Sequence, residues 1–159
     1  MMKTGVLLIL VLVAASLQAA SVLPLEFKKI VQEAGVIFTG RCVGSSHELD
    51  ENNFPVYWIQ YRVEQGIKGV RDLETFWVKQ FDLGAAILCP KDLEQVLFFY
   101  PESKAGFTSS VGLGQGRFAV ELLPSGEKRV TSRYPHLVSP IGGIDLDSFI
   151  SETRRWITP

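Results

Sequence analysis

Apolar residues recur with a period of two through the middle of the chain, which is the pattern of half-buried β-strands. The clearest example is residues 55–65, where Tyr57, Ile59, Tyr61 and Val63 fall on one face. Further strands are predicted at residues 35–45, 73–81, 96–100, 116–122 and 128–133. Because the run 96–100 is apolar throughout, we expect it to be a buried central strand.

Turn-forming residues between these strands predict two antiparallel hairpins. Gly66–Gly69 would connect the second and third strands, and Pro124–Glu127 would connect the last two. Residues 45–54 are predicted to form a polar loop. The side chains expected to face inward are Phe76 and Val78 in the first hairpin and Phe118, Val120 and Leu122 in the second.

Helical spacing appears only near the two ends of this β-rich region. The first set ends at Gly35, has Pro24 in its first turn, and consists of Leu23, Phe27, Ile30, Val31 and Ala34. The second set follows Asp145, a suitable N-cap, and consists of Leu146, Phe149, Ile150, Thr153 and Ile157. The strands do not alternate with helices, so we predict a mainly β fold: a five- to six-stranded antiparallel barrel flanked by an N-terminal and a C-terminal helix.

Residues 1–20 have the order of a secretory signal peptide: Lys3, an apolar run from Gly5 to Ala15, then small residues. The run is shorter than the roughly 20 residues of a membrane-spanning helix, and it contains no cysteine that could carry a lipid. We expect cleavage between residues 16 and 21. Residues 22–159 would then form one exported domain, periplasmic or secreted, with no stable membrane insertion.

The charge balance disfavours nucleic acid as a partner. The chain has 16 basic and 17 acidic residues and a net charge of −1, without a basic stretch of the kind that tracks phosphates. Lys128, Arg129 and Arg133 fall along one predicted strand, where they are more typical of a solvent-facing edge than of a recognition patch.

The two cysteines, Cys42 and Cys89, both lie in the part expected to be exported. An oxidising compartment favours a disulfide between them, which would stabilise the fold by about 4 kcal/mol on the chain-entropy model. The alternative is two separately buried thiols that act as small hydrophobic residues.

Several short motifs resemble parts of phosphate-binding, metal-binding or catalytic sites but lack the neighbouring residues or elements that such sites need. The glycines of residues 112–116 are followed by a strand instead of the helix of a phosphate site, so we expect them to supply unusual backbone angles. His47 and His136 lack further donors at metal-ligand spacing, and neither adjoins a serine in a nucleophile elbow. The cluster of carboxylates Glu48, Asp50 and Glu51 lacks the order of a calcium loop. We therefore predict no catalytic residues, no metal site and no cofactor.

Trp58 and Trp77 fall on the faces opposite the inward sets of their strands. If these strands pair, the two rings lie near one another on the outer surface of the sheet. Exposed aromatic rings are enriched at protein interfaces, so the pair could be a partner surface. The alternative is that a terminal helix covers both rings.

The order of a short helix, GVIFTGRCVGS, PVYWIQYRVEQGIKG, FWVKQF and VLFFY resembles secreted domains related to netrin modules and to the tissue inhibitors of metalloproteinases. The resemblance covers residues 24–100. The later VGLGQGRFAVEL and C-terminal helix are similar to exported bacterial proteins of no established activity. The family likeness implies a five-stranded barrel of the oligosaccharide/oligonucleotide-binding (OB) type, and it raises a protease-inhibitor hypothesis.

The inhibitor mechanism of that family cannot be transferred to this chain. The animal inhibitors ligate their target's zinc through a cysteine at the mature N-terminus, whereas the first cysteine here is Cys42. We therefore predict a non-enzymatic exported module that binds a protein partner, a secreted protease being one candidate. A structural or assembly component of the cell envelope is the alternative, and a hydrolase without a visible site is a third.

Overall fold

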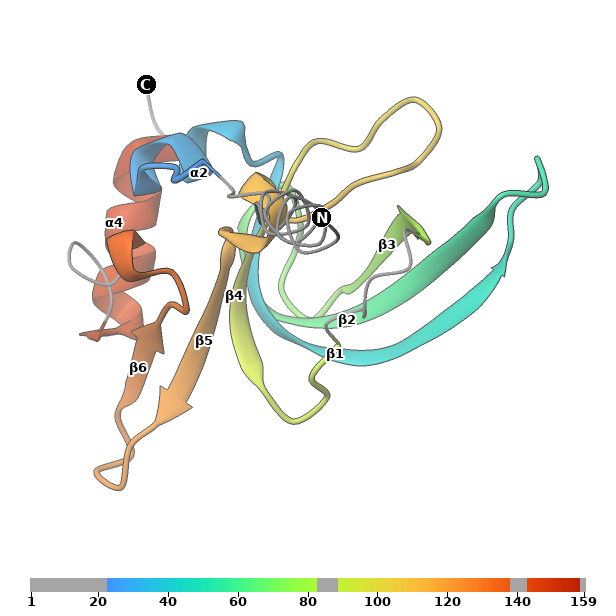
Figure 1. The fold of residues 1–159 in the computed structure, drawn as a ribbon. Helices are drawn as coiled ribbons and strands as arrows, with labels where there is room; N and C mark the ends of the chain where they lie inside the picture. The colour runs from blue at the N-terminus through green and yellow to red at the C-terminus, as the bar shows by residue number, and fades with distance from the viewer. Residues whose placement is uncertain (1–22, 83–88, 138–142, 158–159) are drawn as a thin grey trace, which may run out of the picture.

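The computed structural model describes residues 23–82, 89–137 and 143–157 (Figure 1). The expected signal peptide and its cleavage region lie outside the described residues. The helices are α2 (Phe27–Glu33), the 3-10 helix η1 (Val111–Gly114) and α4 (Leu146–Ile157). The strands are β1 (Val36–Leu49), β2 (Pro55–Lys68), β3 (Thr75–Phe81), β4 (Glu94–Phe99), β5 (Arg117–Leu122), β6 (Lys128–Thr131) and β7 (Ile144–Asp145).

The described strands form one sheet in the order β3-β2-β1-β4-β5-β6-β7, and every neighbouring pair is antiparallel. The mainly β class, both hairpins and the two terminal helices are confirmed. The strand beyond the predicted six is β7, whose two residues are too few to leave a periodic pattern. Among the described residues no ladder joins β3 to β7, so the sheet is open and closure into a barrel is not confirmed.

The sheet is nevertheless strongly bent, as the long arcs of β1 and β2 show (Figure 1). The register between these strands shifts at three places along β1, and such bulges bend and twist a strand. Gly40 lies at one of them, where an added Cβ would come within 2.4 Å of the carbonyl oxygen of Arg62. Only glycine allows the two backbones to approach this closely.

The segment after β4 continues the bend toward β3. Phe107 bridges to Lys79 of β3, and Ser110 bridges to Phe99 of β4. The N–H of Thr108 also donates to the carbonyl oxygen of Lys79 at 3.1 Å. Residues 107–110 therefore lie between the edge strand β3 and the central strand β4, which partly encloses the inner face of the curled sheet.

Strand β4 is buried along its whole length and separates two apolar cores. Val96 and Phe98 contribute to the core beneath α2 and α4, whereas Leu97 and Phe99 contribute to the core inside the curled strands. The predicted central strand is therefore confirmed. The helix-side core also includes Phe27, Ile30, Val31, Phe118 and Phe149, and the other core includes Phe38, Ile59, Tyr61, Val63 and Val78.

Several local predictions were wrong. Gly66–Gly69 is not the turn between the second and third strands, because β2 continues to Lys68 and residues 69–74 make the connection. Leu23 is 82% exposed and precedes α2, which begins at Phe27. Residues 45–54 are not a polar loop throughout, because β1 continues to Leu49 and only residues 50–54 form the turn. Leu122 shares the face of Phe118 and Val120 but is not buried: it is 71% exposed, because β5 extends beyond the part of the sheet that the helices cover. The other inward residues of that hairpin, Phe118 and Val120, are buried as predicted.

A disulfide joins Cys42 of β1 to Cys89, with 5.2 Å between the Cα atoms, which confirms the predicted pairing. It ties the chain just before β4 to the curled half of the sheet. None of the helices in the described part of the chain is long and apolar enough to cross a membrane.

We predict that Phe98→Ala lowers the free energy of unfolding by about 3–5 kcal/mol, because it leaves a cavity where the ring contacts Phe27, Phe118 and Phe149. The exposed Leu122→Ala is the matched control and should change it by less than about 0.5 kcal/mol. Urea denaturation measures both. If both variants lost the same free energy of unfolding, the helix-side core would not be centred on β4.

Candidate protein-binding surface

The β1–β2 hairpin ends in a tight turn organised by Asp50. Its Oδ1 accepts the N–H groups of Asn52 at 2.9 Å and Phe54 at 3.0 Å, and its backbone N–H donates to the carbonyl oxygen of Phe54. Aspartate is favoured in such turns because its short side chain can accept from the backbone that follows it. The turn leaves the ring of Phe54 55% exposed.

The second oxygen of the same carboxylate, Oδ2, lies 3.2 Å from the ammonium group of Lys79 on β3. Lys79 is only 7% exposed, and its Nζ lies 4.4 Å from the ring centroid of Phe107 and 5.8 Å from that of Trp58. A buried ammonium group needs such compensation from a carboxylate and aromatic faces. Lys79 thus ties together the hairpin turn, β3 and the segment after β4.

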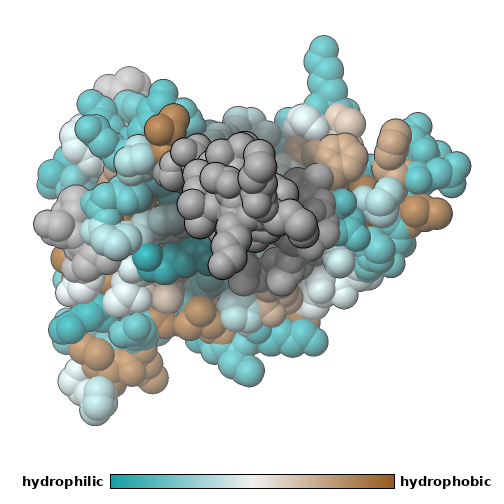
Figure 2. Space-filling model, in the orientation of Figure 1, coloured by the Kyte–Doolittle hydropathy of each residue, from teal (hydrophilic) through white to brown (hydrophobic). Residues whose placement is uncertain are grey.

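Three partly exposed phenylalanine rings, Phe54, Phe81 and Phe107, surround this buried ion pair; we call them the aromatic surface. The rings of Phe81 and Phe107 stack with centroids 3.9 Å apart, and Phe54 meets Phe81 edge to face at 6.5 Å. Phe81 is 51% exposed. Figure 2 shows apolar atoms among hydrophilic ones on this side of the molecule, over the hairpin end and the loop after β4.

A groove of about 340 Å³ continues from the aromatic surface along β3 and the segment after β4. Phe81 and Phe107 form one end of its lining, and the exposed Leu113 also borders it. The remaining lining residues are Gln80, Tyr100, Pro101, Thr108 and Ser109. An apolar groove with a few polar groups is suited to accept a side chain or short segment of another molecule.

The predicted pair of tryptophans lies on one face of the β2–β3 hairpin. Trp58 is opposite Lys79 and Trp77 is opposite Gln60, which makes the two rings diagonal neighbours. Trp77 is 49% exposed, whereas Trp58 is half-buried beside the Lys79 ammonium group. In the described part of the chain, α2 and α4 pack on the core that contains neither tryptophan. The pair borders the aromatic surface along β3.

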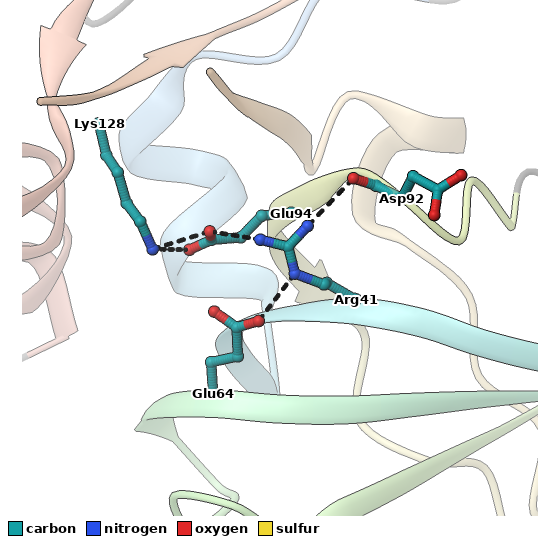
Figure 3. A network of polar contacts seen from close by, with 5 residues as sticks. All are labelled: Arg41, Glu64, Asp92, Glu94 and Lys128. Carbon is teal, nitrogen blue, oxygen red and sulfur yellow. Dashed lines mark hydrogen bonds and ion pairs between the residues drawn. The ribbon is translucent and has the colours of Figure 1, made fainter. Parts of the chain in front are cut away.

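A second polar cluster lies on the helix side of the sheet and links four strands or their flanks (Figure 3). The guanidinium group of Arg41 donates to Glu64 at 2.9 Å, to Glu94 at 3.0 Å and to the carbonyl oxygen of Asp92 at 3.0 Å. Lys128 of β6 lies 2.8 Å from Glu94, whose side chain is 4% exposed. These contacts satisfy the buried Glu94 carboxylate, so the cluster has a structural explanation.

A cavity of about 740 Å³ lies between α2 and α4 and includes His136 in its lining. His136 Nε2 is 2.9 Å from Oε1 of the buried Gln115. The other histidine, His47, lies 3.0 Å from Asp82 through its Nε2. In the described residues no group of three histidine, cysteine or carboxylate side chains could hold a metal ion.

The glycine-rich segment 112–116 does supply unusual backbone angles, with φ of 63° at Gly112 and 99° at Gly114. Gln115, which follows Gly114, is buried, and its amide binds the segment before α2 by accepting from the N–H of Leu25 and donating to the carbonyl oxygen of Leu23. The segment therefore holds residues 23–25 in place ahead of α2.

Among the ionisable groups of the described core, Tyr61 has a raised pKa. Burial of its ring disfavours the phenolate, and the nearby Arg117, which donates to the phenol oxygen at 3.2 Å, opposes this effect only in part. The neutral phenol is therefore a structural hydrogen-bonding group inside the curled sheet.

No protein-family model, curated protein or solved structure matches this chain. The resemblance to netrin modules and metalloproteinase inhibitors therefore stays a prediction. The candidate surface depends on the geometry described above.

Sequence reasoning missed most of this surface. Phe54 lies in a run that is otherwise polar, and Phe107 lies in a segment without periodicity. Lys79 resembles an ordinary solvent-facing residue of a strand, although its alternation with Val78 places it opposite the inner core. The turn-forming run from Asp50 to Asn53 was the available indication that a tight hairpin end carries Phe54 outward.

We predict that the Asp50→Asn variant has a lower Tm than the wild type at neutral pH, because it removes the negative charge beside Lys79. The N–H of Phe54 lowers the pKa of Asp50 most; burial opposes this, and Asn52 and Lys79 lower the pKa further. The pKa of Asp50 in the folded protein thus lies below the ordinary value of 3.8, so its ionised carboxylate stabilises the fold. This stabilisation is complete at pH values above the pKa of Asp50 in the unfolded chain, and it is lost as the pH falls through the pKa in the folded protein.

The Tm difference between wild type and Asp50→Asn should therefore shrink below about pH 4, near the ordinary pKa of a free aspartate. Thermal unfolding followed by circular dichroism from neutral to acidic pH measures it. Glu127→Gln, in the exposed turn between β5 and β6, is the control. A Tm difference that stays constant down to the lowest pH would contradict a role for this carboxylate charge.

Proposed function

We propose that this protein is an exported, non-enzymatic module that binds a protein partner through its aromatic surface. The observation that carries the proposal is the set of three partly exposed phenylalanine rings, two of them about half exposed, around the buried Lys79–Asp50 pair. Aromatic side chains fixed in this way can bind with little loss of side-chain freedom, which is characteristic of interface anchors.

Export is supported by two features. The pattern of residues 1–20 is that of a signal peptide, and the Cys42–Cys89 disulfide is consistent with an oxidising compartment. On this proposal the mature domain functions in the periplasm or is secreted, and its partner is found there.

We further propose that strands β3, β2, β1 and β4, with residues 107–110, are an incomplete OB-type barrel. The two backbone bridges from residues 107–110 to β3 and β4 support this arrangement. It is the architecture that the resemblance to netrin modules and metalloproteinase inhibitors implies. An exported protease is accordingly one candidate partner, and an envelope protein is the alternative.

The test is affinity capture from the exported fraction of the organism that makes the protein. The double variant Phe54→Ala, Phe81→Ala should reduce capture of the partner more than about tenfold, because it removes two buried anchors of the complex. Leu122→Ala removes an exposed apolar side chain outside this surface, and this variant should capture the partner normally. Equal capture by wild type and the double variant would rule out the aromatic surface as the binding site.

Activity assays on the captured material separate the two kinds of partner. If a protease is captured and its activity falls when the domain is added, the module is an inhibitor. If the captured protein is an envelope component, or a protease whose activity does not change, inhibition is excluded and an assembly role follows.

A further inference from the structure

Negative charge is concentrated around the aromatic surface. The segments that build it, residues 47–54, 79–82 and 100–108, contain five carboxylates and two lysines, which gives a net charge of −3. The whole chain has a net charge of only −1, so the rest of the protein is net positive. The acidic character is therefore a local property of this surface.

The exposed charges at the aromatic surface, which a partner would contact, are mostly negative. Lys79 is buried and already paired with Asp50. Glu48, Glu51 and Glu102 are exposed carboxylates, against the one exposed lysine of these segments. The field at the aromatic surface is thus negative, and it acts next to apolar side chains that lower the local dielectric constant.

The sheet register places one of these carboxylates on the same face as the aromatic rings. Glu48 of β1 is opposite Val56 of β2, and Val56 is opposite Phe81 of β3. Side chains in one such row point to the same face, so Glu48 and Phe81 are two strand spacings, roughly 10 Å, apart. Glu51 follows Asp50 in the same turn that carries Phe54.

From this arrangement we infer that the partner presents a cationic apolar segment: a large apolar side chain that enters the groove, flanked by lysine or arginine that meets Glu48 and Glu51. The inference rests on the proposed function and specifies the chemistry of the partner. An acidic segment or an anionic membrane would bring like charges together beside a desolvated aromatic surface, which is unfavourable.

Two synthetic peptides with the same central Leu-Phe-Leu, one flanked by lysines and the other by glutamates, test the inference directly. Each is added to the 15N-labelled mature domain, and binding is followed by NMR. The lysine-flanked peptide should shift the amide signals of Phe54, Phe81 and Phe107, and its affinity should fall as salt is raised. The glutamate-flanked peptide should not bind.

Variants locate the charges that matter. The double variant Glu48→Gln, Glu51→Gln should weaken binding of the lysine-flanked peptide about twofold to fivefold without changing Tm, because rim charges contribute modestly. Glu127→Gln, an equally exposed carboxylate in the turn between β5 and β6, should bind as the wild type does. Phe81→Ala should weaken binding of the peptide more than about tenfold.

The inference is overturned if neither peptide binds, if both bind equally, if the shifted amides lie elsewhere, or if the domain self-associates through this surface in sedimentation experiments. Its failure is distinguishable from failure of the proposed function. If capture of the natural partner depends on Phe54 and Phe81 but is insensitive to Glu48→Gln, Glu51→Gln and to salt, the surface binds a partner of different chemistry.

Discussion

The need to cover both faces of β4 is the constraint on which the rest of the fold depends. All six residues of this strand are buried, and its apolar side chains alternate between two cores. One face requires the helices α2 and α4, and the other requires the curl of β1, β2 and β3. Loss of either cover would expose the apolar side chains on one face of the strand. Burial of each large apolar side chain contributes on the order of 1.5–3 kcal/mol to the stability of the fold, so both covers are needed.

The curl in turn determines where the aromatic surface lies. Bulges along β1 and the close approach at Gly40 bend the β1–β2 hairpin, and its end lies beyond the inner core. There the Lys79–Asp50 pair replaces apolar packing as the contact that holds the hairpin end, β3 and the segment after β4 together. In the part of the chain that the structure describes, Phe54 and Phe81 beside this pair remain about half exposed.

Much of the fold could be predicted because it depends on local periodicity. The alternation in residues 55–65, the apolar run 96–100 and the helical spacing after Asp145 all correspond to elements of the structure. The disulfide was also predictable, since export and two cysteines favour it. Leu122 was misassigned because alternation gives a face but cannot show where the cover over that face ends.

Less of the candidate site could be predicted from the sequence, because it is built from contacts between segments that are distant in the chain. Trp58 and Trp77 were predicted to share a face, and the strand register places them so. The contact between Lys79 and Phe107 joins residues whose separation in the chain gives no periodic pattern. One of the bulges that bend β1 depends on Gly40, whose close approach to Arg62 is visible only in three dimensions.

Native-state hydrogen exchange measured by NMR tests the central claim, that β4 couples two cores into one cooperative unit. Amides of Val78 in β3, Phe98 in β4 and Ile150 in α4 should all exchange only through global unfolding, with the free energy obtained from urea denaturation. If β3 or α4 opens with a free energy about 3 kcal/mol or more below that of β4, the two halves unfold separately and the account is contradicted.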